Sequence, residues 1–242
     1  MMSKRLENEI AHGKKLKAEG AESIWNWESA AGKARANRRA NYFIELARVK
    51  PSDEVLEIGC GTGLFTRKFY EATKANITAI DISEDLLDTA SALLPQAKFM
   101  IDDAMKLKQS DGKFDVVFGS SVLHHLEFEA SLNEIYRVLK PGGRMVFAEP
   151  NMLNPQIFIQ KNVPFIKTWL GDSPDETAIV RWQFANLLKT HGFKNVEIFP
   201  YDFLHPIVPK PLINVVNGIG KFIEKVPVLK EIAGSVIIYA EK

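Results

Sequence analysis

The stretch from Val55 to Gly63 constrains this chain most, because a strand-length apolar run leads directly into a glycine-dense turn. It reads VLEIGCGTG, with glycines at alternate positions from Gly59 onward. A helix-compatible segment begins at Leu64. A strand, a glycine turn and a helix open the nucleotide-binding α/β folds, whose ligands lie beyond the carboxyl ends of parallel strands. Glycine allows the tight turn and lets a ligand approach the backbone without a Cβ between them.

The spacing of these glycines disfavours a dinucleotide site. The pattern G-x-G-x-x-G would require glycine where the chain has Leu64 or Thr66. The pattern E-x-G-x-G-x-G, from Glu57 to Gly63, instead resembles motif I of the class I S-adenosylmethionine (SAM)-dependent methyltransferases. In that family the glycine turn packs against the amino-acid half of the cofactor, which carries no phosphate.

A second candidate site residue ends the next predicted strand, residues 76–80. Asp81 follows Gly63 by 18 positions, where nucleotide-binding sheets place an acid that accepts hydrogen bonds from both ribose hydroxyls. An aspartate at a strand end can also cap the following helix, but Ser83 is available for that role. We therefore expect Asp81 to bind ribose.

The third predicted strand, 98–101, precedes the triplet Asp102-Asp103-Ala104. This triplet resembles the family's adenine-binding motif, with Asp102 in place of the usual glycine. The resemblance implies that an aspartate carboxylate accepts from the adenine amine and that the next backbone N–H meets a ring nitrogen. We expect Asp103 to supply the carboxylate, although Asp102 leaves two acids to choose from.

The fourth predicted strand, 114–120, leads into the sequence SVLHHL, which resembles the family's motif IV. There the loop runs under the methionine moiety and faces the reactive methyl group. His125 is the first candidate for a general base, followed by His124 and Glu149. Adjacent histidines can bind a metal ion, but no third His or Cys lies nearby at metal-ligand spacing. We predict no metal.

Further along, helix 127–139 ends at the sequence KPGG, and a fifth strand is expected over 144–149. The resemblance covers residues 54–150. It implies a Rossmann-like, doubly wound α/β sheet of seven mostly parallel strands, with helices on both faces and an antiparallel last strand. We expect helix 177–190 and strands at 194–199 and 234–240. The predicted SAM-binding residues are Glu57, Gly59, Cys60, Gly61, Gly63, Asp81, Ile82, Asp103, Ala104 and Ser120.

The segments outside the motifs define the expected domain organisation. Residues 1–50 are helical and basic, and form either a helix packed on the sheet or a lid over the cofactor. Residues 51–242 form the SAM-binding domain, with aromatic and proline-rich insertions at about 151–175 and 201–233. These insertions are expected to line an apolar acceptor pocket, or else to cover core or a dimer contact. The apolar stripe within 212–223 could also lie on a membrane surface.

Composition restricts the class of partner and the compartment that we expect. The 242-residue chain has a formal net charge of +1, which argues against nucleic acid as the partner. Its one cysteine permits no internal disulfide and suggests the cytoplasm. We therefore expect a SAM-dependent methyltransferase acting on a small-molecule or lipid-like acceptor. The alternatives are a non-enzymatic SAM-binding regulator and, less favoured, an NAD(P)-dependent oxidoreductase.

Overall fold

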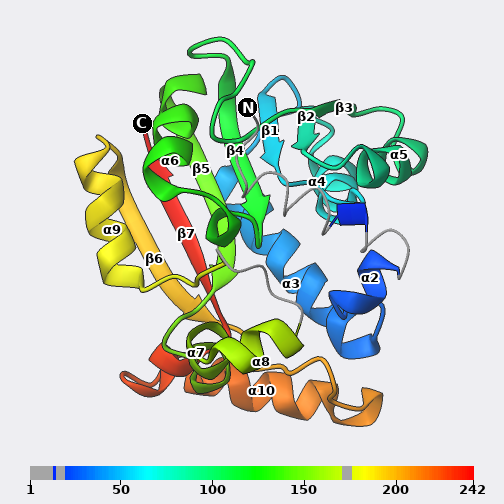
Figure 1. The fold of residues 1–242 in the computed structure, drawn as a ribbon, viewed down its shortest axis with the longest axis vertical. Coiled ribbons are helices and arrows are strands. Elements are labelled where there is room, and N and C mark those ends of the chain that lie inside the picture. The colour runs from blue at the N-terminus through cyan, green and yellow to red at the C-terminus, as the bar shows by residue number, and fades with distance from the viewer. Residues whose placement is uncertain (1–12, 15–19, 171–175) are drawn as a thin grey trace.

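One seven-stranded sheet forms the centre of the molecule in this computed structural model, which describes residues 13–14, 20–170 and 176–242 (Figure 1). The strand order is β3-β2-β1-β4-β5-β7-β6. Only β7 runs antiparallel to its neighbours, β5 and β6, as predicted. The strands are β1 Glu54–Ile58, β2 Asn76–Asp81, β3 Lys98–Ile101, β4 Phe114–Ser120, β5 Leu139–Pro150, β6 Lys194–Tyr201 and β7 Ser235–Glu241.

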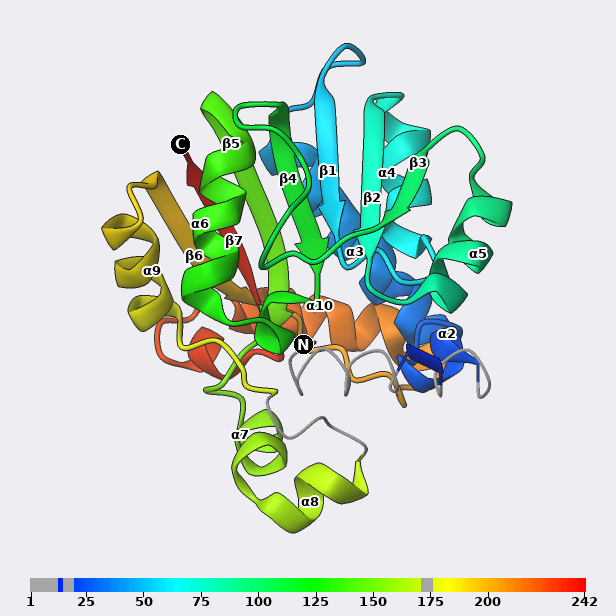
Figure 2. The ribbon, with the colours of Figure 1, turned by 45° about the horizontal axis from the view of Figure 1, so that its top comes forward.

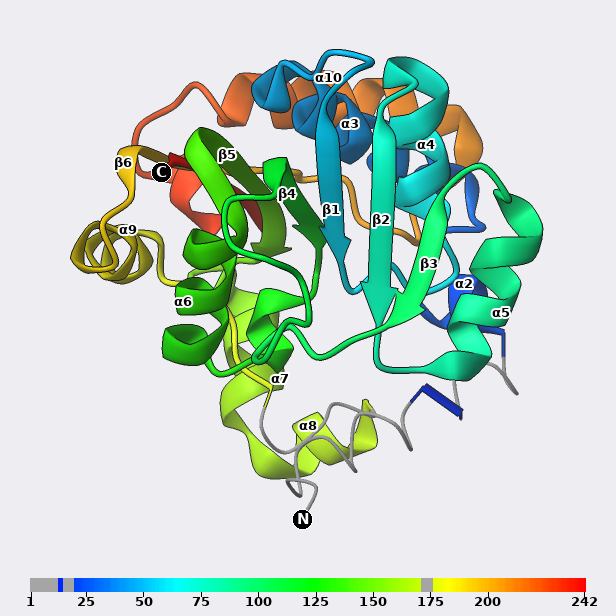
Figure 3. The same cartoon turned by 90° about the horizontal axis from the view of Figure 1, so that it is seen from above.

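Helices cover both faces of this sheet. Figure 3 shows α3, α4 and α10 on one side and α6 and α9 on the other, with α5 beside β3 at the sheet's edge. The helices are α2 Ala21–Ile24, α3 Ala30–Ala47, α4 Leu64–Thr73, α5 Glu84–Leu93, α6 Phe128–Val138, α7 Pro155–Asn162, α8 Pro164–Trp169, α9 Arg181–Thr190 and α10 Ile213–Ile223. The two large apolar clusters, one on each face, bury most of the sheet's side chains. The doubly wound prediction is therefore confirmed.

Two predicted boundaries differ from the structure by more than two residues. Strand β5 begins at Leu139, because Leu139 pairs with Phe114 before an irregularity in the register, so the KPGG sequence lies within the strand. Helix α9 begins at Arg181 rather than at 177. Its expected first turn is extended because the Ile179 N–H donates to the carbonyl of Pro150.

Helix α3 supports the packed interpretation of the N-terminal segment. The Ser29 hydroxyl accepts from the Gly32 N–H and caps its first turn. Ala36, Ala40 and Phe43 then recur on one face and are buried against the sheet. The small alanine side chains let the helix axis approach the sheet closely. Residues 1–12 and 15–19 of the predicted 1–50 extension lie outside the described residues.

The two predicted insertions form the lower end of the molecule in Figure 1, and Figure 2 shows α7 and α8 projecting below α10. The first supplies α7 and α8, and residues 171–175 of it lie outside the described part of the chain. The second supplies α10, flanked by 3-10 turns at Lys210–Leu212 and Leu229–Ile232. Among the described helices, none combines the length and apolar character required to span a bilayer.

Candidate cofactor and acceptor site

A pocket of about 800 Å³ opens where β1, β2 and β4 end. This volume lies near the upper end of the roughly 300–1,000 Å³ typical of small-molecule sites, so it suits a large ligand or two adjacent ligands. Ten of the predicted site residues line it: Gly59, Cys60, Gly61, Asp81, Ile82, Asp103, Ala104, Ser120, His124 and His125. Glu57, Gly63 and Glu149 lie behind the lining.

The turn after β1 is held open by glycines and by Asp81. Gly59, Gly61 and Gly63 all have positive φ, at 67°, 53° and 80°. The Gly61 N–H donates to Asp81 Oδ2 at 2.8 Å, and the Ser83 N–H donates to Oδ1 at 2.9 Å. The carboxylate therefore joins the β1 and β2 turns, and the Ser83 hydroxyl makes no helix-cap hydrogen bond. The ribose-binding role of Asp81 stays a prediction.

The three glycines meet different neighbours. A Cβ on Gly61 would lie 2.9 Å from the Trp25 ring, which covers the turn at the pocket. A Cβ on Gly63 would lie 3.0 Å from the Ala90 Cβ, on α5 and away from the pocket. Gly63 thus permits helix packing, whereas Gly61 lets the Trp25 ring lie against the bare backbone of the turn.

Glu57 lies beneath the turn and is 1% exposed. Its Oε2 atom has no hydrogen-bond partner among the described residues. Burial raises the pKa of Glu57 to about 8, with a smaller contribution from the charge of Asp81. The side chain is therefore a protonated acid under the cofactor turn at neutral pH, and its predicted role in SAM binding would be exerted through the turn.

The two adjacent aspartates after β3 differ in their surroundings. The Asp102 carboxylate accepts from the Asp103 and Lys108 amides and is 3% exposed. Asp103 accepts from the Met105 N–H through Oδ1 only, and it is half-buried. Asp102 therefore fixes the loop, while Asp103 keeps an oxygen for a ligand. This arrangement favours Asp103, as expected, for the adenine amine.

The histidine pair is held by an acid from the neighbouring strand. Glu149, at the end of β5, is completely buried and accepts from the Val122 and Leu123 amides. Its Oε2 lies 2.7 Å from His124 Nδ1. Burial alone would raise the pKa of Glu149. The hydrogen bonds from His124 and the two amides nevertheless hold this pKa below its ordinary value. Burial, and next the neighbouring His125, lower the pKa of His124, so the ring is neutral at pH 7.

These states fix the histidine tautomer. A carboxylate beside a neutral imidazole requires the proton on His124 Nδ1, which leaves Nε2 as the basic nitrogen. His124 lines the pocket, whereas Glu149 does not. The geometry therefore favours His124 over Glu149 as the group that contacts an acceptor, with Glu149 orienting it.

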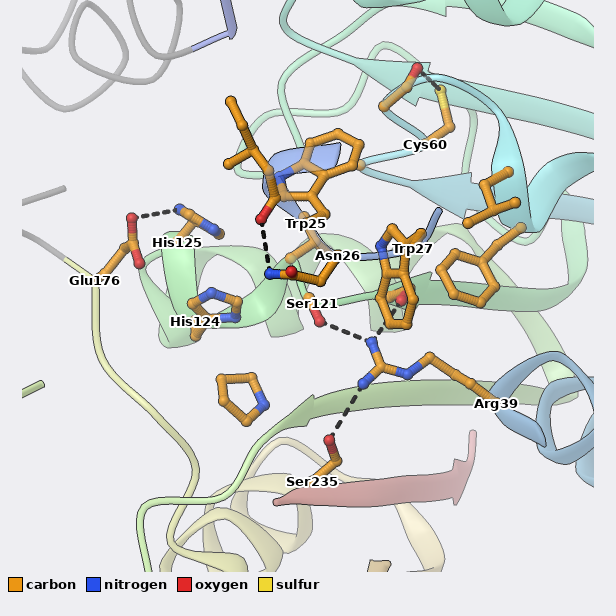
Figure 4. Close-up of a pocket in the computed structure, with 18 of the residues that line it drawn as sticks. Trp25, Asn26, Trp27, Arg39, Cys60, Ser121, His124, His125, Glu176 and Ser235 are labelled. Carbon is orange, nitrogen blue, oxygen red and sulfur yellow. Dashed lines mark hydrogen bonds and ion pairs between the residues drawn. The ribbon is translucent and has the colours of Figure 1, made fainter. Parts of the chain in front are cut away.

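The second histidine lies beside two residues that the sequence did not single out. His125 Nδ1 is 3.7 Å from Glu176 Oε1, and the Lys161 ammonium donates to Glu176 Oε2 at 2.6 Å (Figure 4). His124, His125 and Glu176 each offer a metal-ligand atom within 4.8 Å of the others. Lys161 already neutralises Glu176, however, and Glu149 occupies His124 Nδ1. The absence of a metal stays a prediction.

Arg39 is a pocket residue that the motif analysis missed. It is 3% exposed and reaches from α3 to the ends of three strands. Its guanidinium donates to the hydroxyls of Tyr201, Ser120, Ser121 and Ser235 (Figure 4). Among the described residues, none of its hydrogen-bond partners is a carboxylate. A buried cation surrounded by neutral groups is unfavourable unless a ligand supplies the negative charge.

Ser121 is strained where it meets Arg39. Its φ is +54°, in the left-handed region that non-glycine residues rarely adopt. Its amide donates to the Ala148 carbonyl at 2.7 Å, which fixes this conformation. Strained residues of this kind gather at ligand sites. The sequence carried no signal for this contact, since Arg39 and Ser121 are 82 positions apart.

Known proteins resemble this chain in sequence and in fold. A methyltransferase domain model matches residues 56–147. The 2-methyl-6-phytyl-1,4-hydroquinone methyltransferase of Synechocystis sp. is 32% identical over 182 residues, which cover 72% of this chain and 57% of that protein. Sterol 24-C-methyltransferase ERG6B of Gibberella zeae is 34% identical over 180 residues, covering 69% and 44%. The chain thus spans about half the length of these relatives.

A solved structure supports the same relationship at the level of the fold. A SAM-dependent methyltransferase from Archaeoglobus fulgidus superposes with a TM-score of 0.61 at 20% identity, covering 85% of this chain and 92% of that one. The predicted cofactor, SAM, is the one that this relationship assigns to the pocket. The sequence match, the strand order and the glycine turn agree, and residues 56–147 form a methyltransferase domain of the class I SAM-dependent type.

Proposed function

We propose that this protein transfers a methyl group from SAM to a small, lipid-like acceptor. The observation that carries the proposal is the pocket itself, which joins the glycine turn to the insertion helices in one cavity of about 800 Å³. Ile157, Leu170 and Ile207 from the insertions line it, together with polar residues such as Gln156 and Gln160. The cavity therefore joins the cofactor turn to a wall of mixed apolar and polar side chains.

SAM supplies a methyl group on a positively charged sulfonium, which is already activated for transfer. The chain's residues then have to bind SAM and the acceptor, align them with each other, and exclude water from the pocket. Asp81 and Asp103 offer carboxylate oxygens at the ends of β2 and β3. Arg39 offers a positive charge at the ends of β4 and β7, where it would compensate the carboxylate of an amino-acid group.

An acceptor whose reacting atom carries a proton needs a base that removes this proton. His124 Nε2 is suited to take that proton, because Glu149 holds the proton on Nδ1 and stabilises the resulting imidazolium. His125, beside Glu176 and Lys161, is the second candidate. An acceptor whose reacting atom has no proton would leave both histidines with a positioning role only.

The relatives support the acceptor class. Their names specify a phytylated hydroquinone and a sterol as acceptors. Both compounds combine a large apolar body with a small reactive group. The apolar side chains that the insertions contribute to the pocket suit the body of such an acceptor, and the polar ones suit its reactive group. We include peripheral contact with a membrane in the proposal. Cys60 is a free, buried thiol, which supports a reducing compartment, the cytoplasm, as the site of action.

The first experiment is calorimetric titration of S-adenosylhomocysteine into the wild type, with NAD as the control ligand. We expect micromolar binding, no measurable binding of NAD, and at least tenfold weaker binding by Asp81→Ala and Asp103→Ala. Glu84→Ala, an exposed acid on α5, is the matched control. Tighter binding of NAD than of S-adenosylhomocysteine would contradict the proposal.

A second experiment separates an enzyme from a SAM-binding regulator. The protein is incubated with methyl-labelled SAM and with detergent-dispersed prenylated hydroquinones, sterols or a total lipid extract. We expect label in an organic-soluble product. Binding of S-adenosylhomocysteine with no labelled product from any of these would favour the regulator.

A further inference from the structure

The insertions expose bulky apolar side chains to an unusual degree. Phe165 and Trp169 on α8 are 79% and 75% exposed, and Ile207 before α10 is 80% exposed. Phe222 on α10 is 69% exposed. Soluble proteins seldom expose contiguous apolar groups of this size without a function.

Helix α10 has two apolar faces. Ile213 and Gly220 are buried against the rest of the molecule. Val215, Ile219 and Phe222 follow one another at spacings of four and three, and all three are exposed. Packing inside the described part of the chain therefore explains only the first face, and the second faces outward.

The charge around these side chains is positive. The segment 207–233 contains the lysines Lys210, Lys221, Lys225 and Lys230. Its only acids are Glu224 and Glu231. In the segment 155–170, Lys161 and Lys167 bond to Glu176 instead. Glu224 pairs with Arg38 and Glu231 with Arg181, so neither is available to neutralise the lysines. Apolar side chains among lysines complement an anionic lipid surface.

Both exposed segments also contribute a residue to the pocket. Leu170 and Ile207 line the pocket and belong to the two exposed segments. Figure 1 shows α8 and α10 at the same end of the molecule, the end toward which β4 points, and Figure 3 places them on opposite sides of the sheet. A flat surface at this end of the molecule would touch both helices.

We propose that this end of the protein docks on an anionic lipid bilayer, with Phe165, Trp169, Ile207, Val215, Ile219 and Phe222 inserted among the lipids. We call these six residues the docking surface. The pocket then opens toward the bilayer, and an apolar acceptor enters without crossing water. The proposal rests on the proposed function only for the nature of the acceptor, because docking itself requires neither SAM nor catalysis.

Vesicle sedimentation tests the docking directly. We expect the wild type to bind vesicles of phosphatidylcholine with phosphatidylglycerol, and to bind vesicles of phosphatidylcholine alone at least tenfold less. High salt should weaken the binding because lysines contribute. Phe222→Asp and Trp169→Asp should each reduce binding about tenfold or more, whereas Leu93→Asp, at an apolar position on α5 that is 51% exposed, should bind like the wild type.

Insertion has its own spectroscopic readout. Trp169 is the most exposed of the four tryptophans, so brominated lipids should quench its emission, and Trp169→Phe should remove most of that quenching. Equal binding by the Asp variants and the wild type would overturn the proposal. So would a dimer in analytical ultracentrifugation that Phe222→Asp dissociates, because a second copy would then cover this surface. Calorimetry with S-adenosylhomocysteine needs no lipid, so failure of docking and failure of the proposed function are distinguishable.

Discussion

Three buried ionisable side chains near the pocket show how differently a charge can be accommodated. Glu149 is ionised because two amides and an imidazole bond to it. Glu57 has no such partners and is protonated at neutral pH. Arg39 cannot lose its charge, and the groups that bond to it are neutral. The first is stabilised by its hydrogen bonds, the second is uncharged, and the third bonds to four hydroxyl groups with no carboxylate among its described partners.

Arg39 should therefore contribute to cofactor affinity. We expect Arg39→Met to weaken binding of S-adenosylhomocysteine by at least tenfold in calorimetry, since the carboxylate of the ligand would lose its buried cation. Arg67→Met, a matched change on exposed α4, should leave the affinity unchanged. Thermal unfolding of each variant checks that the fold survives. Unchanged affinity in a folded Arg39→Met protein would mean that this cation serves structure alone.

Glu57 should make the fold less stable as pH rises. Its pKa of about 8 lies above the ordinary value of 4.5, so the folded protein binds more protons than the unfolded chain. The free energy of unfolding therefore falls between about pH 4.5 and pH 8 from this group, on the order of a few kcal/mol in total. Glu57→Gln should remove that part of the slope in urea titrations at pH 5 and pH 8. Parallel slopes in the two proteins would contradict the assignment.

At the scale of elements, the end of β5 controls the loop that follows β4. Glu149 bonds to the start of the short 3-10 turn Leu123–His125 and orients the first of its histidines. The glycine turn after β1 is controlled in the same way by Asp81, from the end of β2. In both places an acid at the end of one strand fixes the loop that follows the adjacent strand. Each loop, and the pocket residues on it, is therefore held more firmly than by its own backbone alone.

The histidine loop leads to a prediction for the pH dependence of turnover. The pKa of His124 is lowered, so a base at this position stays neutral at pH 7 and activity should decline only below about pH 6.5. Glu149→Gln removes a negative charge, so the acid limb of the pH–kcat profile should move to still lower pH. Turnover should fall because the tautomer is no longer fixed, with little change in S-adenosylhomocysteine affinity. An acid limb at the same pH in both enzymes would exclude His124 as the base.

The packing between the glycine turn and α5 can be tested with two glycines. Gly63 and Gly112 both have positive φ, but only Gly63 would bring a new Cβ against a neighbour. Gly112→Ala should lower the free energy of unfolding by about 1 kcal/mol through backbone strain alone. Gly63→Ala should lower it by roughly 1–3 kcal/mol more, because Ala90 is in the way. Urea unfolding measures both losses of free energy, provided that the m-value is the same in all the proteins. Equal losses in the two variants would contradict this role for Gly63.

At the scale of the whole molecule, segments far apart in sequence close the pocket from several sides. Helix α2 covers the glycine turn, with the Thr62 hydroxyl donating to Glu22 and the Trp25 ring over Gly61. The insertions supply the opposite wall. We propose that α2 and the residues up to Ser29 form the lid suggested by the sequence, hinged on the firmly packed α3.

A lid should respond to ligand. We expect S-adenosylhomocysteine to slow amide hydrogen exchange at residues 20–29 by about tenfold or more, because opening then requires loss of ligand contacts. Helix α10 should show no comparable change and serves as the internal reference. Identical exchange at 20–29 with and without ligand would leave α2 as a static part of the fold.

Local pattern predicted much of the fold and the cofactor half of the site. Strands 54–58, 98–101 and 114–120 are found as expected, because continuous apolar runs between turn residues have few other solutions. The start of α9 and the length of β5 were wrong, since pairing of Ile179 and Leu139 with distant backbone overrides local preference. Arg39 and Glu176 were missed because neither belongs to a motif.

The sequence by itself determined the sheet, the cofactor turn and the family, because these depend on residues close together in the chain and on the backbone conformations that glycine permits. Only the tertiary structure decided which groups share the pocket. It brought a cation from α3 to strand ends more than 80 residues away, paired His125 with Glu176, and left one face of α10 uncovered. Those contacts depend on how helices pack across the sheet, and the physical interactions that fix them are long-range.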